Sequence, residues 1–380
     1  MVHIKADDIN EELQLLSRTD AYSINLFKNI AGTNFTENVL VSPIIAFEAV
    51  VMYGTSEKKN KYAYMDTAQS SNNNIDQQSL QNLIYRLNNA QNVKLQIVNN
   101  ICIDNKIPLK PELKELTNSL SYFKICELDL AEPGNTATAI NNWVDQKTNN
   151  LIKEIIQSDD ITSDVHMIVL NAVYFQAFLK NQFKNRSIRY RAFYLSNNNK
   201  KFIPTMSNID SYVYGNLPDL KAKFIELPYD NCKLKMTIII PNEIEGLKDI
   251  VANLEYFNQT RLASSGTRQN VYVMLPKFKI DTTVNVKSAF ENLGLTNMLK
   301  AKKSISTTTN EALFMDKIIQ KIVIHVNEEE FNNINISNVQ SDTLKQIETI
   351  VAVNRPFVLT IIDDETKMTL FIGLISNPVY

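Results

Sequence analysis

The chain has 380 residues and a nearly neutral balance of charge, with 39 Lys and Arg against 41 Asp and Glu. Charges of both signs are scattered along it, which argues against a nucleic-acid groove or a membrane surface as its partner. No apolar run reaches the ~20 residues that a transmembrane helix needs. The N-terminus lacks the basic-then-apolar order of a cleavable signal. We therefore expect a protein that is cytoplasmic, or secreted by an unconventional route.

The first half of the chain is mainly helical in pattern. Asp20 is a typical N-cap residue ahead of apolar residues at helical spacing. Ser42 and Pro43 supply an N-cap and a first helical residue after a short strand at 38–41. Amphipathic spacing predicts further helices at 77–87, 111–120 and 136–156, and a strand at 95–103.

The second half is mainly strand in pattern. A nearly continuous apolar run at 165–176 suits a strand that is covered on both faces. Strands are also expected at 224–227, 234–241, 269–275 and 317–326, and a short helix at 286–293 ends at Gly294. Helices early and strands late, without regular alternation, predict one α+β domain over residues 1–380.

Three cysteines, Cys102, Cys126 and Cys232, are an odd number and show no CxxC spacing. This pattern favours small buried thiols in a reducing compartment. No GxSxG, HExxH, P-loop or GxGxxG motif is present. We therefore expect neither an enzyme nor a bound cofactor or metal.

The last quarter of the chain contains a long, weakly patterned stretch. It opens at Glu328-Glu329, runs over 330–353, and is followed by Asn354-Arg355-Pro356-Phe357 and two strand-like segments. Loops of this length inside a compact domain are usually functional or disordered. Because strand-like segments flank this one, both of its ends are expected to be pinned.

Separated segments of the chain together resemble the serpins, a family of protease inhibitors. Each segment is weakly specific, but their order and spacing follow the family over nearly the whole chain. They are Asn38–Pro43, Asn141–Val144, Leu170–Phe175, Glu226–Tyr229, Leu275–Phe278, Leu293–Leu295, and the C-terminal set from Asn354 to Pro378. The resemblance implies three β-sheets, about nine helices and an exposed reactive loop at about 330–353. Low Gly and high Asn, Ile and Lys content fit an AT-rich genome, for which a large DNA virus is one hypothesis, and within the family the chain resembles an intracellular or poxvirus-type member with a divergent hinge.

The resemblance also implies a mechanism. In this family a protease attacks the loop and forms an acyl-enzyme, and the cut loop then enters the main sheet as an extra strand. The expected function is suicide-substrate inhibition of a serine or cysteine protease of unknown identity by a monomer.

The hinge after Glu328 departs from the family, which usually has Gly, then Thr or Ser, then small residues. On insertion, alternate side chains would face the core and Ile334 and Ile336 would face outward. Buried Asn side chains without partners cost about 1–3 kcal/mol each. A non-inhibitory serpin that acts as a binding or decoy protein is therefore the alternative. The hinge residues are Glu328, Glu330, Phe331, Asn333 and Asn335, and the side chains expected to face the core are Phe331, Asn333, Asn335 and Ser337.

A polar cluster beneath the main sheet controls strand separation in the family. Ser42 and Asn171 match it, whereas Ile45 replaces its second serine and Gln320 its histidine. A glutamine amide can still donate and accept hydrogen bonds, so the cluster is expected to be altered rather than lost.

Three positions of the loop are candidates for the residue before the cut bond. The family's spacing counted from Glu328 leads to Leu344, which suits a chymotrypsin-like pocket. Counting back from Pro356 leads to Lys345, which suits a trypsin-like pocket. The sequence Val339-Gln340-Ser341-Asp342 resembles a caspase site that ends at Asp342. The alternative for each is a solvated residue that no protease selects.

Overall fold

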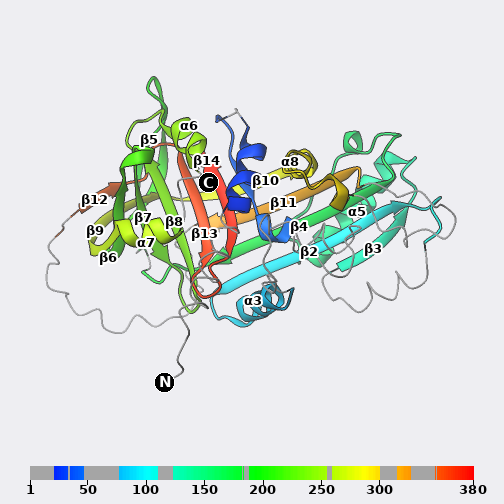
Figure 1. Cartoon of the computed structure of the whole chain (residues 1–380), viewed down its shortest axis with the longest axis horizontal. Helices are drawn as coiled ribbons and strands as arrows, with labels where there is room; N and C mark the ends of the chain where they lie inside the picture. The colour runs from blue at the N-terminus through cyan, green and yellow to red at the C-terminus, as the bar shows by residue number, and fades with distance from the viewer. Residues whose placement is uncertain are drawn as a thin grey trace.

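A computed structural model describes most of the chain as two β-sheets with helices packed against them (Figure 1). The described residues are 21–32, 35–46, 77–109, 123–181, 183, 188–254, 259–299, 315–326, 347 and 349–380. Helices occupy residues 21–31 and 43–46. The longer labelled helices are α3 (Gln77–Asn89) and α5 (Pro133–Lys147), and the shorter ones are α6 (Leu247–Ala252), α7 (Gln259–Ser265) and α8 (Lys287–Asn292). Single 3₁₀ turns lie at Ser158–Asp160, Pro218–Leu220 and Thr296–Leu299.

The five-stranded sheet has the order β10-β11-β4-β2-β3. Its central strands β11 and β4 are parallel, whereas β10 pairs antiparallel with β11 and β2 pairs antiparallel with β4. β2 and the edge strand β3 are parallel. The strands are β2 (Val93–Asp104), β3 (Phe123–Leu128), β4 (Met167–Ala177), β10 (Phe278–Asn285) and β11 (Lys317–Val326).

The nine-stranded sheet has the order β1-β14-β13-β8-β7-β6-β9-β12, and β5 also pairs with β6. The 19 residues of β6 bond to β5 at one end, to β7 at the other and to β9 along most of their length. Three sheets were expected from the sequence. Because hydrogen bonding is continuous through β6, the described residues form two sheets. The strands are β1 (Val39–Val41), β5 (Arg189–Ser196), β6 (Asn199–Leu217), β7 (Ala222–Pro228), β8 (Leu234–Pro241), β9 (Gly266–Pro276), β12 (Thr349–Ala352), β13 (Phe357–Asp363) and β14 (Thr369–Ile375).

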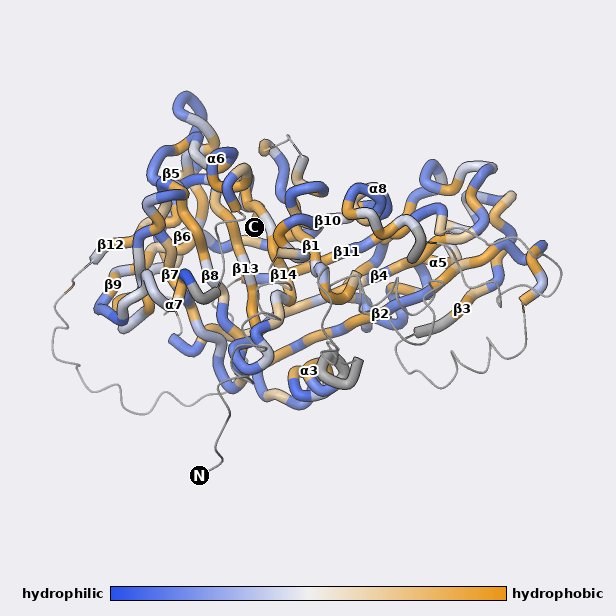
Figure 2. The backbone as a smooth tube through the Cα atoms, viewed as in Figure 1, coloured by the Kyte–Doolittle hydropathy of each residue, from blue (hydrophilic) through white to orange (hydrophobic). Residues whose placement is uncertain are grey.

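Apolar side chains from both sheets form the main core, which includes Phe175, Ile322 and Phe371. A second cluster lies beneath α5, where Ile140 and Val144 pack on the opposite face of the five-stranded sheet. A third lies between the nine-stranded sheet, the helix at 21–31 and α6. The central strands β4 and β11 are mostly hydrophobic along their length (Figure 2). The prediction that the run at 165–176 is covered on both faces is confirmed for 167–175, the first nine residues of β4, which are buried, whereas His166 is exposed.

The sequence predicted β8 and β11 with their observed bounds, but one helix was predicted too long. The helix expected at 136–156 ends at Lys147. Asn149 and Asn150 follow with φ values of 54° and 60°, a left-handed conformation that interrupts a helix. The isoleucines at 152, 155 and 156 are still buried beneath α5, so their apolar spacing reflects packing and not helix. The helix expected at 111–120 lies outside the described residues.

The expectation of three free thiols is wrong for two cysteines. Cys102 and Cys126 occupy the same register position of β2 and β3, and they form a disulfide with a Cα–Cα distance of 4.7 Å. Cys232 is free and half-buried. Burial raises the pKa of its thiol, because an apolar surrounding disfavours the thiolate.

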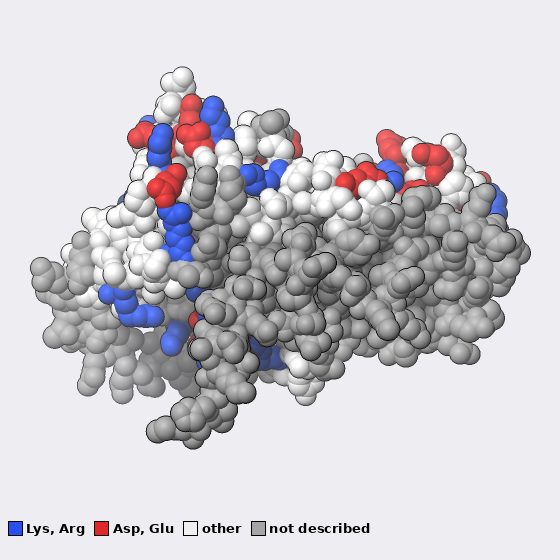
Figure 3. Space-filling view, viewed as in Figure 1, with Lys and Arg blue, Asp and Glu red and all other residues white. Residues whose placement is uncertain are grey.

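The described surface carries charges of both signs, and Figure 3 shows Lys and Arg interspersed with Asp and Glu on its visible face. Within the described part of the chain, no helix combines the length and apolarity required to cross a membrane. The same residues bring together no group of three or more His, Cys, Asp or Glu side chains that could hold a metal ion.

Candidate functional site

β11 and β4 are neighbours in the five-stranded sheet and pair in parallel, with no strand between them. This line of pairing is called the seam below. β11 pairs with β4 over nine consecutive positions, from Lys317 opposite Ile168 to His325 opposite Gln176. The long segment singled out in the sequence begins directly after β11. It ends at β12, which is paired with β9 in the other sheet. The two strands that flank this segment therefore belong to different sheets.

A buried polar cluster crosses this seam. The Gln320 side chain, on β11, is fully buried, and its Nε2 donates to Asn171 Oδ1 at 2.6 Å. The same amide also donates to the Ser42 carbonyl at 3.1 Å and accepts from the Ser42 backbone N–H at 2.8 Å. Asn171 Nδ2 in turn donates to Asn99 Oδ1 on β2. One row of polar side chains thus links β11, β4 and β2 to the start of a helix.

Strand register explains why these residues meet. Gln320 is opposite Asn171, and Asn171 is opposite Asn99, so all three lie in one row across the sheet. Ser42 directly follows β1, which places its backbone groups beneath β11 at the start of the helix at 43–46. The structure therefore brings together all three cluster residues named from the sequence.

Asn99 is a member of the cluster that sequence reasoning missed. The available signal was the pair Asn99-Asn100 within the apolar stretch 97–103 of β2, and both side chains are buried. Ile45, which stands where the family has a second serine, packs in the main core instead.

The cluster is only partly satisfied by hydrogen bonds. Ser42 Oγ and Asn99 Nδ2 are buried and have no partner among the described residues. Unpaired buried polar atoms cost about 1–3 kcal/mol each. The seam between β11 and β4 therefore combines well-packed aliphatic residues with one row whose polar atoms are incompletely paired.

The hinge and cleavage candidates lie outside the described residues. These are Glu328, Glu330, Phe331, Asn333, Asn335, Ser337, Asp342, Leu344 and Lys345. The expected loop of 330–353 is too long at its C-terminal end, because β12 already occupies Thr349–Ala352. Val351 and Val353 are buried there, and this apolar anchoring explains why the segment pairs with β9.

The residues after β12 are also fixed. The Tyr194 backbone N–H donates to the Asn354 carbonyl at 2.8 Å. The Arg355 guanidinium donates to the Asn242 carbonyl. The long segment is thus anchored beyond its C-terminal end by both β12 and the residues that follow.

These features define a class of protein in which a long chain segment connects β11, inside the five-stranded sheet, to the edge strand β12 of the other sheet. The family model described as "Serpin (serine protease inhibitor)" matches residues 17–378. The chain therefore belongs to the serpin family, as its sequence motifs predicted.

Two similar proteins come from Manduca sexta and from human. The chain is 26% identical over 333 residues to alaserpin of Manduca sexta, covering 84% of this chain and 83% of the relative. It is 24% identical over 374 residues to human neuroserpin, covering 94% and 90% of the two chains. The poxvirus-type subclass stays a prediction.

Solved structures confirm the fold. Uncleaved ovalbumin superimposes with a TM-score of 0.81 at 18% identity, covering 96% of this chain and all of that one. Serpin48 of Tenebrio molitor gives a TM-score of 0.79 at 22% identity, covering 97% and 99% of the two chains. At these identities the likeness establishes the serpin fold, and the fold class expected from the sequence is confirmed.

Proposed function

We propose that this serpin inhibits a serine or cysteine protease by cleavage of its loop and insertion of the cut loop between β11 and β4. The observation that supports this most directly is the nine-position parallel pairing of those strands. The strand that leads into the loop is itself one side of the seam, so a cut loop can fold back along it without a long connection.

Insertion has a favourable backbone term. A loop that continues from β11 and folds back runs antiparallel to both β11 and β4. One parallel ladder is thereby replaced by two antiparallel ladders. Because antiparallel pairing is slightly more stable per residue than parallel pairing, the added strand gains hydrogen bonds of the better geometry.

The outward orientation of Ile334 and Ile336 on insertion costs less free energy than the sequence alone indicates. The outer face of the sheet beside the seam is covered in part by α5, whose Ile140 and Val144 pack in a cluster with Ile319 of β11. Where α5 covers the inserted strand, the outward-facing Ile334 and Ile336 would be shielded from water.

Ser337, one of the residues that would face the core on insertion, also suits the polar cluster of Gln320 and Asn171. If Phe331 comes opposite Val326, antiparallel register places Ser337 opposite Gln320. The hydroxyl of Ser337 would then lie between Gln320 and Asn171 and could hydrogen-bond to both, which compensates for the separation of those two side chains.

The alternative function, a non-inhibitory serpin that binds a partner or acts as a decoy, is supported by two other hinge positions. In the same register Asn333 and Asn335 come opposite Ile324 and Ile322. Both isoleucines are fully buried in the main core. Each asparagine would cost about 1–3 kcal/mol unless it found a partner.

Thermal melting before and after nicking the loop with a mild protease distinguishes the two. A rise in melting temperature by tens of degrees is expected if the loop inserts. An unchanged or lower melting temperature would refute insertion and favour the binding function.

Incubation with chymotrypsin, trypsin and a caspase then tests Leu344, Lys345 and Asp342 as cleavage residues. The expected product is a protease complex that survives denaturing electrophoresis, and mass spectrometry of the released C-terminal peptide identifies the cut bond. Cleavage without any complex would leave the protein a substrate and not an inhibitor.

A further inference from the structure

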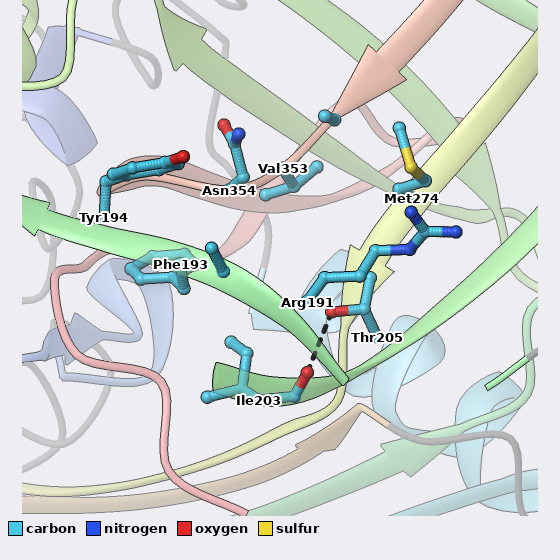
Figure 4. A pocket seen from close by; sticks show the side chains of 10 residues that line it. Arg191, Phe193, Tyr194, Ile203, Thr205, Met274, Val353 and Asn354 are labelled. Atoms are coloured by element: carbon cyan, nitrogen blue, oxygen red, sulfur yellow. Dashed lines mark hydrogen bonds between the residues drawn. The ribbon is translucent and has the colours of Figure 1, made fainter. Parts of the chain in front are cut away.

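A cavity of about 310 Å³ lies where the residues after β12 meet β5, β6 and β9 (Figure 4). Its volume falls at the lower end of the about 300–1,000 Å³ that is common for small-molecule sites. One wall is formed by residues 352–354, so a molecule in the cavity would touch the segment that anchors the loop. The side chains that matter most are Arg191, Phe193, Ile203, Met274 and Val353.

Arg191 brings a positive charge to this cavity. The alternation of a strand places Arg191 and Phe193 of β5 on the same face, and both line the cavity. The Arg191 guanidinium extends toward β9, and its Nη2 donates to the Tyr272 hydroxyl at 3.3 Å. Its Nε is buried and has no hydrogen-bond partner among the described residues. A guanidinium keeps its charge at every physiological pH.

Two of the other polar side chains that line the cavity, those of Thr205 and Asn354, already have partners. The Thr205 hydroxyl donates to the Ile203 carbonyl at 3.1 Å. Asn354 Oδ1 accepts a hydrogen bond from Arg355 Nε at 3.2 Å. Arg191 is thus the charged group of the lining. Because its Nε is enclosed by surrounding atoms, the terminal nitrogens Nη1 and Nη2 are the atoms that a molecule in the cavity would contact.

The remainder of the lining is largely apolar. Phe193 and Val353 are buried, as is Ile203, and Met274 is half-buried beside them. An occupant that suits these surroundings has an anionic end for the guanidinium and a short apolar body for the aliphatic and aromatic walls. Guanidinium groups match the planar geometry of a carboxylate, and such hydrogen bonds are stronger than neutral ones.

We propose that this cavity binds a small organic carboxylate, and that the bound molecule holds β12 and the residues after it in place. Besides the parallel pairing of β12 with β9, two backbone hydrogen bonds attach this segment, from Val353 N–H to the Met274 carbonyl of β9 at 2.9 Å and from Tyr194 N–H of β5 to the Asn354 carbonyl at 2.8 Å. A ligand that contacts Arg191 and Val353 together adds a further link between β5 and this segment. This site requires no protease and is independent of the function proposed above.

Hexanoate is a suitable probe, with 1-hexanol as an uncharged molecule of the same chain length. Isothermal titration with the uncleaved full chain is expected to give saturable binding of hexanoate and at least tenfold weaker binding of 1-hexanol. Hexanoate is also expected to raise the melting temperature, because a ligand that binds only the folded state stabilises it by mass action.

Two variants of the cavity lining and one control variant locate the site. Arg191→Met is expected to weaken hexanoate binding at least tenfold, whereas Arg268→Met, an exposed arginine of β9 outside the cavity, leaves it unchanged. Ala352→Met fills the cavity from the opposite wall without removing the charge, and it is expected to reduce hexanoate binding as well. Melting of each variant without ligand verifies that it folds.

Three results would overturn the proposal: no saturable binding of hexanoate, equal binding of 1-hexanol, or equal hexanoate affinity in folded Arg191→Met. Since no protease enters the titration, a failure here leaves the inhibitor proposal standing. A protein that fails to form protease complexes can likewise still bind hexanoate.

Discussion

Gln320 and Asn171 face each other across the parallel seam of β11 and β4, and the amide of the first donates a 2.6 Å hydrogen bond to the carbonyl oxygen of the second. Both side chains are buried, and the Gln320 amide also bonds twice to the Ser42 backbone. A loop that entered the sheet would have to separate this pair. The control of sheet opening by this cluster is a prediction that mutation can test.

Gln320→Leu is expected to destabilise the uncleaved protein by about 1–3 kcal/mol for each buried group left without a partner, chiefly Asn171 Oδ1 and the Ser42 N–H. Equilibrium unfolding in urea measures the change. Gln320→His restores one donor and one acceptor and is expected to lose less stability. Equal stability of Gln320→Leu and the parent would mean that the cluster contributes nothing to the seam.

Replacement of Glu330-Phe331-Asn332-Asn333 by Gly-Thr-Ala-Ala is expected to raise the yield of stable protease complex. Small residues remove the cost of burying Phe331 and Asn333, and Gly eases the backbone turn at the hinge. Densitometry of denaturing gels gives the ratio of complex to cleaved serpin. If this ratio does not change, the hinge is not what limits inhibition.

Arg86 of α3 pairs with the fully buried carboxylate of Asp363 at the end of β13, at 2.8 Å, and also with Glu365 at 2.6 Å. Arg86→Met is expected to cost about 2–3 kcal/mol. That is less than the 3–5 kcal/mol typical for breaking a fully buried pair, because the Arg86 side chain is 30% exposed. Chemical denaturation measures the loss.

Glu365→Gln is the matched control, since Glu365 is exposed and surface pairs contribute about 0–1 kcal/mol. A loss in Arg86→Met no larger than that of Glu365→Gln would contradict a structural role for the Arg86–Asp363 pair.

The Cys102–Cys126 disulfide joins β2 to the edge strand β3. Replacing both cysteines by alanine is expected to destabilise the protein by about 2–4 kcal/mol, chiefly because the unfolded chain gains freedom. Mass spectrometry of non-reduced peptides verifies the bond. Of the two locations expected from the sequence, we propose the extracellular one, because disulfides persist mainly in oxidising compartments.

Cys232 is expected to react slowly with iodoacetamide in the folded protein. Burial raises the pKa of its thiol, and the thiolate is the reactive form. The rate at pH 8 should be lower than in the urea-unfolded chain and should still be rising above pH 9. Because the folded state favours the neutral thiol, this stabilising contribution is complete below the unfolded pKa of about 8.5 and is lost as pH rises through the folded value. Cys232→Ala serves as the blank.

The sequence by itself determined the family and most of the strands. Segments rich in apolar and β-branched residues predicted β8 and β11 with their observed bounds, because such residues favour strands that are largely buried. Ser42, Asn171 and Gln320 were also named from the family motifs. β5 and β6 were not predicted from the sequence, because polar residues are frequent along both strands. Even aromatic residues of these strands, such as Tyr190 and Phe202, are exposed.

Tertiary structure alone decided which distant residues meet. Asn99 joins the cluster, and Cys126 meets Cys102, only because strand register places them opposite residues that are 72 and 24 positions away. The cavity at Arg191 likewise requires the hairpin of β5 and β6 to meet β9 and β12, which lie in later parts of the chain. Local patterns record whether a side chain is buried, but the pairing of strands follows from packing over the whole core, which no single segment encodes.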